Sequence, residues 1–90
     1  MALGQMTAGT PVNITSTTTV GKTSGTLVGV FVNSTSSGTL ALYDGTDANG
    51  TVIIPAVALV ALTYYPLSAV CKTGLHAVIA NTMNVTIFYA

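Results

Sequence analysis

Short runs of alternating apolar and polar residues, separated by clusters of Gly, Asn, Asp and Ser, recur about every ten residues along the chain. Val, Ile, Thr, Tyr and Phe dominate these runs, and these side chains favour strands. No segment shows the i, i+3, i+4, i+7 apolar spacing of an amphipathic helix. The pattern therefore predicts an all-β fold, a sandwich or a barrel of seven to eight short strands.

The strands expected from this pattern comprise residues 12–20, 26–33, 39–43, 51–54, 63–67, 74–80 and 83–90. Turns are expected at 21–25, 34–38 and 44–50, and the last two strands should form a hairpin across Asn81 and Thr82. Pro55 should end or bend the strand that contains it. Residues 56–62 are compatible with either a helical turn or a strand. We expect one domain, residues 12–90, preceded by an irregular N-terminal arm, residues 1–11.

The alternation also predicts which side chains face the core. Leu40 and Leu42 share one face of their strand and should be buried. The run 26–33 is apolar on both faces, which is typical of a central strand. The single cysteine, Cys71, rules out an intramolecular disulfide and should act as a small core side chain.

Charge is almost absent from the 90 residues: Lys22, Lys72, Asp44 and Asp47 are the only charged side chains. They make up 4% of the chain, against about 25% in ordinary soluble domains. A nucleic-acid binder needs a basic face to displace counterions, and two distant lysines do not make one. Intrinsic disorder is equally unexpected in a chain that is 50% hydrophobic. We expect no nucleic-acid partner.

Neither a membrane span nor a secretion signal is expected. The longest apolar stretch, residues 52–62, contains Pro55 and is shorter than the roughly 20 residues that a spanning helix needs. The first ten residues have neither the positive region nor the apolar region of a signal peptide. The pattern thus predicts a protein that stays where it is made or leaves as part of something larger, with no membrane partner.

Candidate chemistry is sparse. Asp44 and Asp47 lie three residues apart in a Gly- and Asn-rich segment, and this spacing favours a turn over a pair of catalytic carboxylates or a calcium loop. His76 is the only histidine, so one chain offers no structural zinc site, although a ring of histidines around a symmetry axis stays open. We expect no catalytic, metal-binding or cofactor-binding residue, and no enzyme.

Zero net charge on so apolar a chain predicts a subunit of an assembly, because self-repulsion is what keeps small domains apart. The apolar segment 56–62 is longer than a turn requires and should pack in a subunit interface. Tyr64 and Tyr65 are adjacent, so on a strand their rings point to opposite faces, and one of them can contact a partner. The candidate interface residues are Val57, Leu59, Tyr64, Tyr65 and His76.

The segment from Thr26 to Ala90 resembles small β-sandwich structural proteins of tailed bacteriophages. In these proteins a G-V-x-V-N strand, an S-S-G-T-x-x-L-Y-D-G turn-strand-turn and a closing G-L … T-I-x-Y hairpin follow one another. The corresponding residues here are Gly29-Val30, Val32-Asn33, Ser36 to Thr39, Leu42 to Gly45, Gly74-Leu75 and Thr86 to Tyr89. The resemblance covers about two-thirds of the chain and rests on strand and turn residues, which are more specific for fold than for role.

This resemblance implies a jelly-roll-like or immunoglobulin-like antiparallel β-sandwich that serves as a capsid decoration, or cement, protein. Such a subunit would form a homo-oligomer, a trimer in many cases, and would bind the major capsid protein on the outer surface of the virion after synthesis in the host cytoplasm. The alternative is a phage tail or fibre module that recognises a host surface glycan. For that role Tyr43 and Asp44 are the one neighbouring aromatic and acidic pair.

Overall fold

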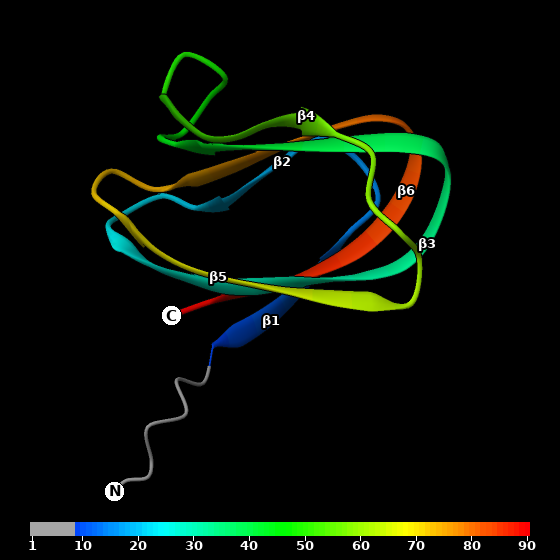
Figure 1. Ribbon diagram of the computed structural model, residues 1–90. Helices are drawn as coiled ribbons and strands as arrows, with labels where there is room; N and C mark the ends of the chain where they lie inside the picture. Colours follow the sequence, from blue (N-terminus) through cyan, green and yellow to red (C-terminus); the bar gives the residue numbers. More distant parts are fainter. Residues whose placement is uncertain (1–8) are drawn as a thin grey trace, which may run out of the picture.

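Six strands form the regular structure of residues 9–90, the part of the chain that the computed structural model describes, and this part contains no helix (Figure 1). The strands are β1 (Thr10–Ile14), β2 (Thr18–Gly21), β3 (Gly25–Asp44), β4 (Thr51–Val57), β5 (Thr63–Cys71) and β6 (Leu75–Tyr89). All pairings between them are antiparallel. The predicted all-β, antiparallel class is confirmed.

Two long strands, β3 and β6, form the centre of the sheet and pair from Leu27–Tyr89 at one end to Tyr43–His76 at the other. On the outer side of β6, β1 pairs with one half of the strand and β2 with the other. Along the outer side of β3, β5 pairs with one half of the strand and β4 pairs with the other half. The sheet therefore has two halves, which lie one above the other in Figure 1.

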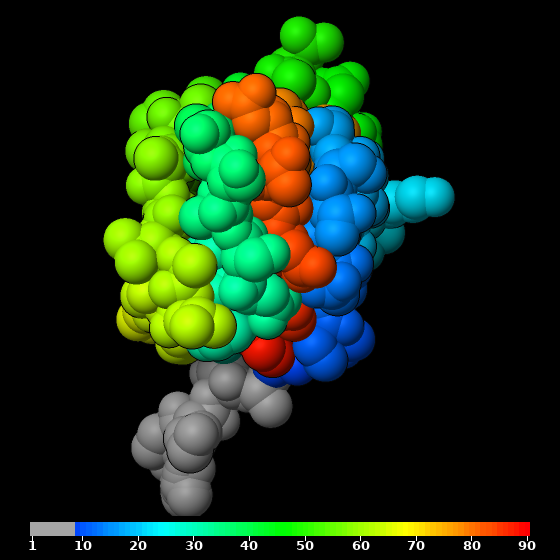
Figure 2. Space-filling view, turned by 90° about the vertical axis from the view of Figure 1, so that its right-hand side faces the viewer, coloured from blue at the N-terminus to red at the C-terminus, as the bar shows by residue number. Residues whose placement is uncertain are grey.

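The two halves are connected by a corner at which β3 and β6 bend together. Figure 2 faces this corner, where the two strands run side by side. Ser36 and Ser37 both pair with Thr82, which is a β-bulge. Ser37 and Asn81 have φ values of 55° and 62°, and the Asn81 side-chain amide donates a hydrogen bond to the Ser37 carbonyl oxygen at 2.9 Å. A bulge together with left-handed residues turns the strands through the corner without reversing them.

This corner corrects three predictions. Residues 34–38 do not form a turn between two strands, and Asn81 and Thr82 do not close a hairpin, because β3 and β6 each run through the corner. The described residues consequently form six strands where seven to eight were expected. The polar residues that suggested chain reversals lie at this bend, where they are exposed to solvent; they are Ser34, Ser36, Ser37, Asn81 and Thr82.

The N-terminal boundaries also differ from the prediction. Thr10 and Pro11, assigned to the arm, belong to β1 and pair with Tyr89 and Phe88. The remainder of the predicted arm, residues 1–8, lies outside the described residues. The predicted strand 12–20 is interrupted between β1 and β2, because these two strands pair with opposite ends of β6.

The core lies between the two halves and is apolar throughout. Leu40 and Leu42 belong to it as predicted, and Cys71 is fully buried within it. The other buried members are Ile14, Leu27, Val30, Val32, Leu75, Ala77, Met83, Val85 and Ile87. No polar side chain of the described residues is buried, so no side chain in the core needs a hydrogen-bond partner.

All three prolines lie in outer strands: Pro11 in β1, Pro55 in β4 and Pro66 in β5. Pro55 does not end its strand, which continues to Val57 with a shift of register. The following residues, 58–62, are neither helix nor strand, so both expectations for this part of the segment were wrong. A proline removes one backbone donor from an exposed edge and so hinders pairing with another sheet.

Candidate functional site

The four charged side chains gather at one end of the molecule, where the β2–β3, β3–β4 and β5–β6 connections meet (Figure 1). The Gly45 amide donates a hydrogen bond to the Gly74 carbonyl oxygen at 3.2 Å, which ties two of these connections together. We call this end the loop end. The remaining described surface carries no charged side chain.

At the loop end Asp44 organises backbone and is not arranged as a catalytic group. Its carboxylate accepts hydrogen bonds from the backbone amides of Lys72 and Thr73, both at 2.9 Å, and of Gly74 at 3.4 Å. These bonds stabilise the ionised form and, with the Lys72 charge, lower the pKa of Asp44 below its ordinary value of about 3.8. Asp47 accepts a bond from the Asn49 amide at 2.9 Å, which is the turn role predicted from the sequence.

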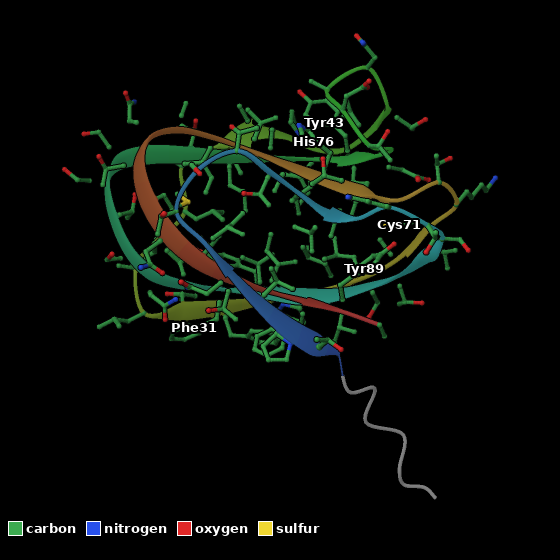
Figure 3. The ribbon with its side chains drawn as sticks, turned by 180° about the vertical axis from the view of Figure 1, so that it is seen from behind. Phe31, Tyr43, Cys71, His76 and Tyr89 are labelled. Carbon is green, nitrogen blue, oxygen red and sulfur yellow. The ribbon has the colours of Figure 1, made fainter. Side chains whose placement is uncertain are left out.

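His76 lies beside Tyr43, its cross-strand partner, on the outer face of the sheet half that contains β4 (Figure 3). Its Nδ1 is 2.9 Å from Thr19 Oγ1, and the Thr19 hydroxyl donates to the Thr46 carbonyl oxygen at 3.0 Å. Because the single hydroxyl proton is used on Thr46, Nδ1 of His76 must be the donor towards Thr19. Through Thr19, His76 connects β2 and the β3–β4 loop to β6.

Within residues 9–90 no three side chains among His, Cys, Asp and Glu come close enough together to hold a metal ion. Cys71 is enclosed by the core, and burial raises the pKa of its thiol. A protonated, inaccessible thiol is neither a nucleophile nor a metal ligand.

An asparagine network lies on the outer face of the half that contains β5. Asn84 Oδ1 accepts hydrogen bonds from the amides of Asn13 at 2.8 Å and of Asn33 at 3.0 Å. The same two amides donate to Thr86 Oγ1 at 3.2 and 3.1 Å. Asn33 follows the inward-facing Val32 in β3, so the alternation along the strand places it on this outer face. The network links β1, β6 and β3 through their side chains.

Next to this network lies an aromatic group. Tyr64 and Phe88 are in edge-to-face contact, with ring centroids 6.0 Å apart and an interplanar angle of 76°. Phe31, the cross-strand partner of Tyr64, lies on the outer side of the same half (Figure 3). Tyr64 extends across β3 at Gly29, where a Cβ would collide with the tyrosine hydroxyl and lie 2.6 Å from its Cζ. Gly29 therefore lets the ring lie close to the sheet.

Within residues 9–90 the exposed large hydrophobic side chains belong to β4, β5 and the segment between them, with Val52 on the outer face of the half that contains β4 and Tyr64 on the outer face of the half that contains β5. The large hydrophobic residues that are exposed are Val52, Val60, Leu62, Tyr64 and Val70, with exposed fractions of 52, 66, 77, 44 and 76%. We call these five residues the exposed apolar set. Residues 48–71, which include all five, carry no charge. An antiparallel sheet normally presents polar side chains to water on its outer face, so these residues depart from the usual pattern.

The predicted interface residues are distributed over both sides of their strands. Tyr64 is exposed and belongs to the exposed apolar set, whereas Tyr65 packs against the core, as expected for adjacent residues of a strand. Leu59 also packs against the core, and Val57 is half-buried opposite Leu40. His76 is half-buried in the other half of the sheet, so the structure does not bring it together with Tyr64.

The candidate interface residues named from the sequence did not include Val60, Leu62 and Val70, although Val60 and Leu62 lie in the segment 56–62 that was expected to pack in an interface. Their outward position could have been deduced from the alternation of side chains along the strand. Cys71 faces the core, so every second residue before it should be directed inward and the residues between them outward. This alternation holds from residue 58 to residue 71 and places Val60, Leu62 and Val70 outside.

No protein-family model, no curated protein and no solved structure matches this chain. Among the residues that the structure describes, no helix is both long and apolar enough to cross a membrane.

Proposed function

We propose that this protein is a non-catalytic virion subunit of the capsid decoration, or cement, type, which self-associates and binds the outer surface of the major capsid shell. The observation that carries the proposal is the exposed apolar set, five large hydrophobic side chains in a stretch without charge. Exposed apolar patches on small soluble proteins mark surfaces that a partner covers. In a permanent assembly, the neighbouring subunits keep such a surface covered.

The fold supports the same proposal. A jelly-roll-like β-sandwich is our proposed class for it, because the two halves of the sheet lie over a common apolar core. Stabilisation of a shell would be mechanical: a subunit that binds only the assembled shell shifts the equilibrium towards assembly by mass action. This role needs no catalytic group, and the carboxylate best placed for one, Asp44, is occupied with backbone amides.

The test is co-sedimentation of the purified protein with shells assembled from the major capsid protein of the same particle. We expect binding that saturates at a fixed number of copies per shell, together with a higher temperature of shell disruption. Folded protein that stays in the supernatant at all concentrations would contradict the proposal.

A second candidate function, recognition of a glycan, is favoured by the face that carries Tyr64 and Asn84. Aromatic rings stack on the C–H faces of sugars, and side-chain amides exchange hydrogen bonds with hydroxyl groups. Among the hydrogen bonds between residues 9–90, the network leaves Oδ1 of Asn13 and of Asn33 and Nδ2 of Asn84 unused. Binding on a glycan array that Tyr64→Ala and Asn84→Ala abolish, and Tyr43→Ala on the other half preserves, would favour this function.

A further inference from the structure

The β3–β4 loop contains a sequence that favours spontaneous chemistry of the backbone. Asn49 is followed by Gly50, and it is the one asparagine of the chain with a glycine after it. Because glycine has no side chain to shield its amide nitrogen, that nitrogen can reach the side-chain carbonyl carbon of the residue before it. We propose that Asn49 is a site of spontaneous deamidation in the folded protein, whereas the fold protects Asp44 from the corresponding reaction. This modification goes beyond the proposed function and does not depend on it.

The reaction needs no reactant besides the chain and water. The Gly50 amide nitrogen bonds to Cγ of Asn49, the bond between Cγ and Nδ2 breaks, and the Gly50 amide proton leaves with the amino group as ammonia. The product is a succinimide ring. Water then adds either at Cγ, which gives aspartate, or at the Asn49 carbonyl carbon, which gives isoaspartate. Nothing is oxidised or reduced, and the product carries one negative charge more than asparagine.

The loop leaves the Asn49 side chain able to react. Asn49 is exposed, and among the hydrogen bonds between residues 9–90 its side-chain amide takes part in none, while its backbone amide donates to Asp47 Oδ1 at 2.9 Å. The Gly50 amide donates to the Asp47 carbonyl oxygen at 3.2 Å, which is long for such a bond. Exposed loops open locally with little free energy, so this bond does not block the attack. The side chains of the other asparagines are hydrogen-bonded; they are Asn13, Asn33, Asn81 and Asn84.

The same loop offers an internal comparison, because Asp44 also precedes a glycine, Gly45, and could form the same succinimide. Its carboxylate is held by two backbone amides of the β5–β6 connection, both at 2.9 Å. These bonds keep the pKa of Asp44 below its ordinary value, and an ionised carboxylate is a poor target for a nitrogen nucleophile. Gly45 is buried, and its amide donates to the Gly74 carbonyl oxygen at 3.2 Å. The fold therefore protects Asp44 and leaves Asn49 reactive.

The loop requires the glycine that makes Asn49 reactive. A Cβ at Gly50 would collide with the Asp44 carbonyl oxygen, and it would lie 2.9 Å from the Asp44 carbonyl carbon and 3.1 Å from Gly45 Cα. These are backbone atoms, which cannot rotate away as a side chain can. The close approach of the two ends of the loop thus needs glycine at position 50. For this reason the test changes Asn49 and keeps Gly50.

The experiment compares the folded wild-type protein with Asn49→Gln, both incubated at full length at pH 8. Gln keeps the charge and the backbone amide that donates to Asp47, so circular dichroism should show an unchanged fold. Attack on a Gln side chain would need a larger ring, which forms far more slowly. Asn49→Asp serves as the reference for the product. The samples are followed by isoelectric focusing and by peptide mapping with mass spectrometry, in which the other asparagines are internal controls.

We expect the wild-type protein, whose sequence has an isoelectric point of about 6.5, to accumulate a more acidic species with aspartate and isoaspartate at position 49. Asn49→Gln should form acidic species at least about tenfold more slowly, a difference of about 1.4 kcal/mol in activation free energy. A wild-type protein that stays unmodified, or in which another asparagine reacts first, overturns the inference. So does an Asn49→Gln variant that becomes acidic as fast as the wild type.

The protection of Asp44 is tested by a second incubation, at pH 5, of the folded protein and of the protein unfolded in guanidinium chloride. Unfolding removes the backbone amides from the Asp44 carboxylate, so isoaspartate at position 44 should form in the unfolded protein and not in the folded one. Equal rates of isoaspartate formation at position 44 in the two samples would overturn the protection that we infer from the fold.

Discussion

The corner at which β3 and β6 bend together predicts that Gly38→Ala destabilises the protein. Gly38 is buried directly after the bulge at Ser37. A Cβ at this position would collide with the Thr82 carbonyl oxygen, and it would lie 2.8 Å from Met83 Cβ. Because the colliding atoms belong to or adjoin the β6 backbone, they cannot rotate away, and one strand must move relative to the other.

The size of the effect follows from two opposing contributions. No glycine among the described residues has a positive φ, so alanine is compatible with the backbone of Gly38. By itself the substitution would raise the free energy of unfolding by about 0.4–1 kcal/mol, because it restricts the unfolded chain. Overpacking a buried site costs about 1–3 kcal/mol, and contact with backbone places Gly38 towards the upper end. The net expected loss is about 1–2 kcal/mol, or a fall in Tm of roughly 5–15 °C.

The measurement is urea-induced unfolding followed by far-ultraviolet circular dichroism, since the chain contains no Trp. Ser36→Ala, at an exposed position of the same corner, is the control and should change the free energy of unfolding by less than about 0.5 kcal/mol. A Gly38→Ala variant as stable as the wild type, or more stable, would mean that β3 and β6 do not cross this closely and would refute the described corner.

Three further predictions concern the loop end and the core. The pKa of Asp44 is lowered in the folded state, so its contribution to stability is present above its ordinary pKa of about 3.8 and is lost as the pH falls through the lower folded value. Asp44→Asn should therefore flatten the acid side of a Tm–pH profile, and an unchanged profile would contradict this contribution. The Cys71 thiol should react with a disulfide reagent at pH 8 only as fast as the protein unfolds, and immediate reaction of the folded protein would contradict its burial. Leu42→Ala should lower the free energy of unfolding by about 2–5 kcal/mol in the same urea assay, because Leu42 is fully buried.

The fold class could be predicted from the sequence because the strand signal is local. Alternation identified Leu40 and Leu42 as core residues, and β-branched residues marked every strand. The sequence pattern does not distinguish a bend within one long strand from a chain reversal between two short strands. Ser, Gly and Asn are favoured at both, because each needs exposed backbone and positive φ. Whether residues 34–38 and Asn81 reverse their strands or bend them depends on two distant segments being paired at that point.

The exposed apolar residues were predicted only in part, because the sequence does not fix which face of the apolar segment is directed outward. The segment 56–62 was expected to lie in an interface because it is too apolar for a turn, and this stays a prediction; Tyr64, also expected there, is exposed. Val57 and Leu59 were chosen because they are apolar, but the apolar segment has two faces and these two residues are on the inner one. Only the inward direction of Cys71 and Tyr65 fixes which parity reaches solvent.

The position of the prolines and of the exposed apolar set together constrain the kind of assembly that this protein can form. A chain that is almost pure strand and nearly uncharged would be expected to join other copies edge to edge, which extends a sheet without limit. Here Pro11, Pro55 and Pro66 lie within three of the four outer strands, and the exposed large hydrophobic residues of the described part of the chain belong to β4, β5 and the segment between them. A side-chain contact through these residues saturates once they are covered. Replacing Pro55 and Pro66 together by Thr should therefore convert a defined oligomer into species of increasing mass in light scattering, and an unchanged mass would show that these prolines do not restrain edge pairing.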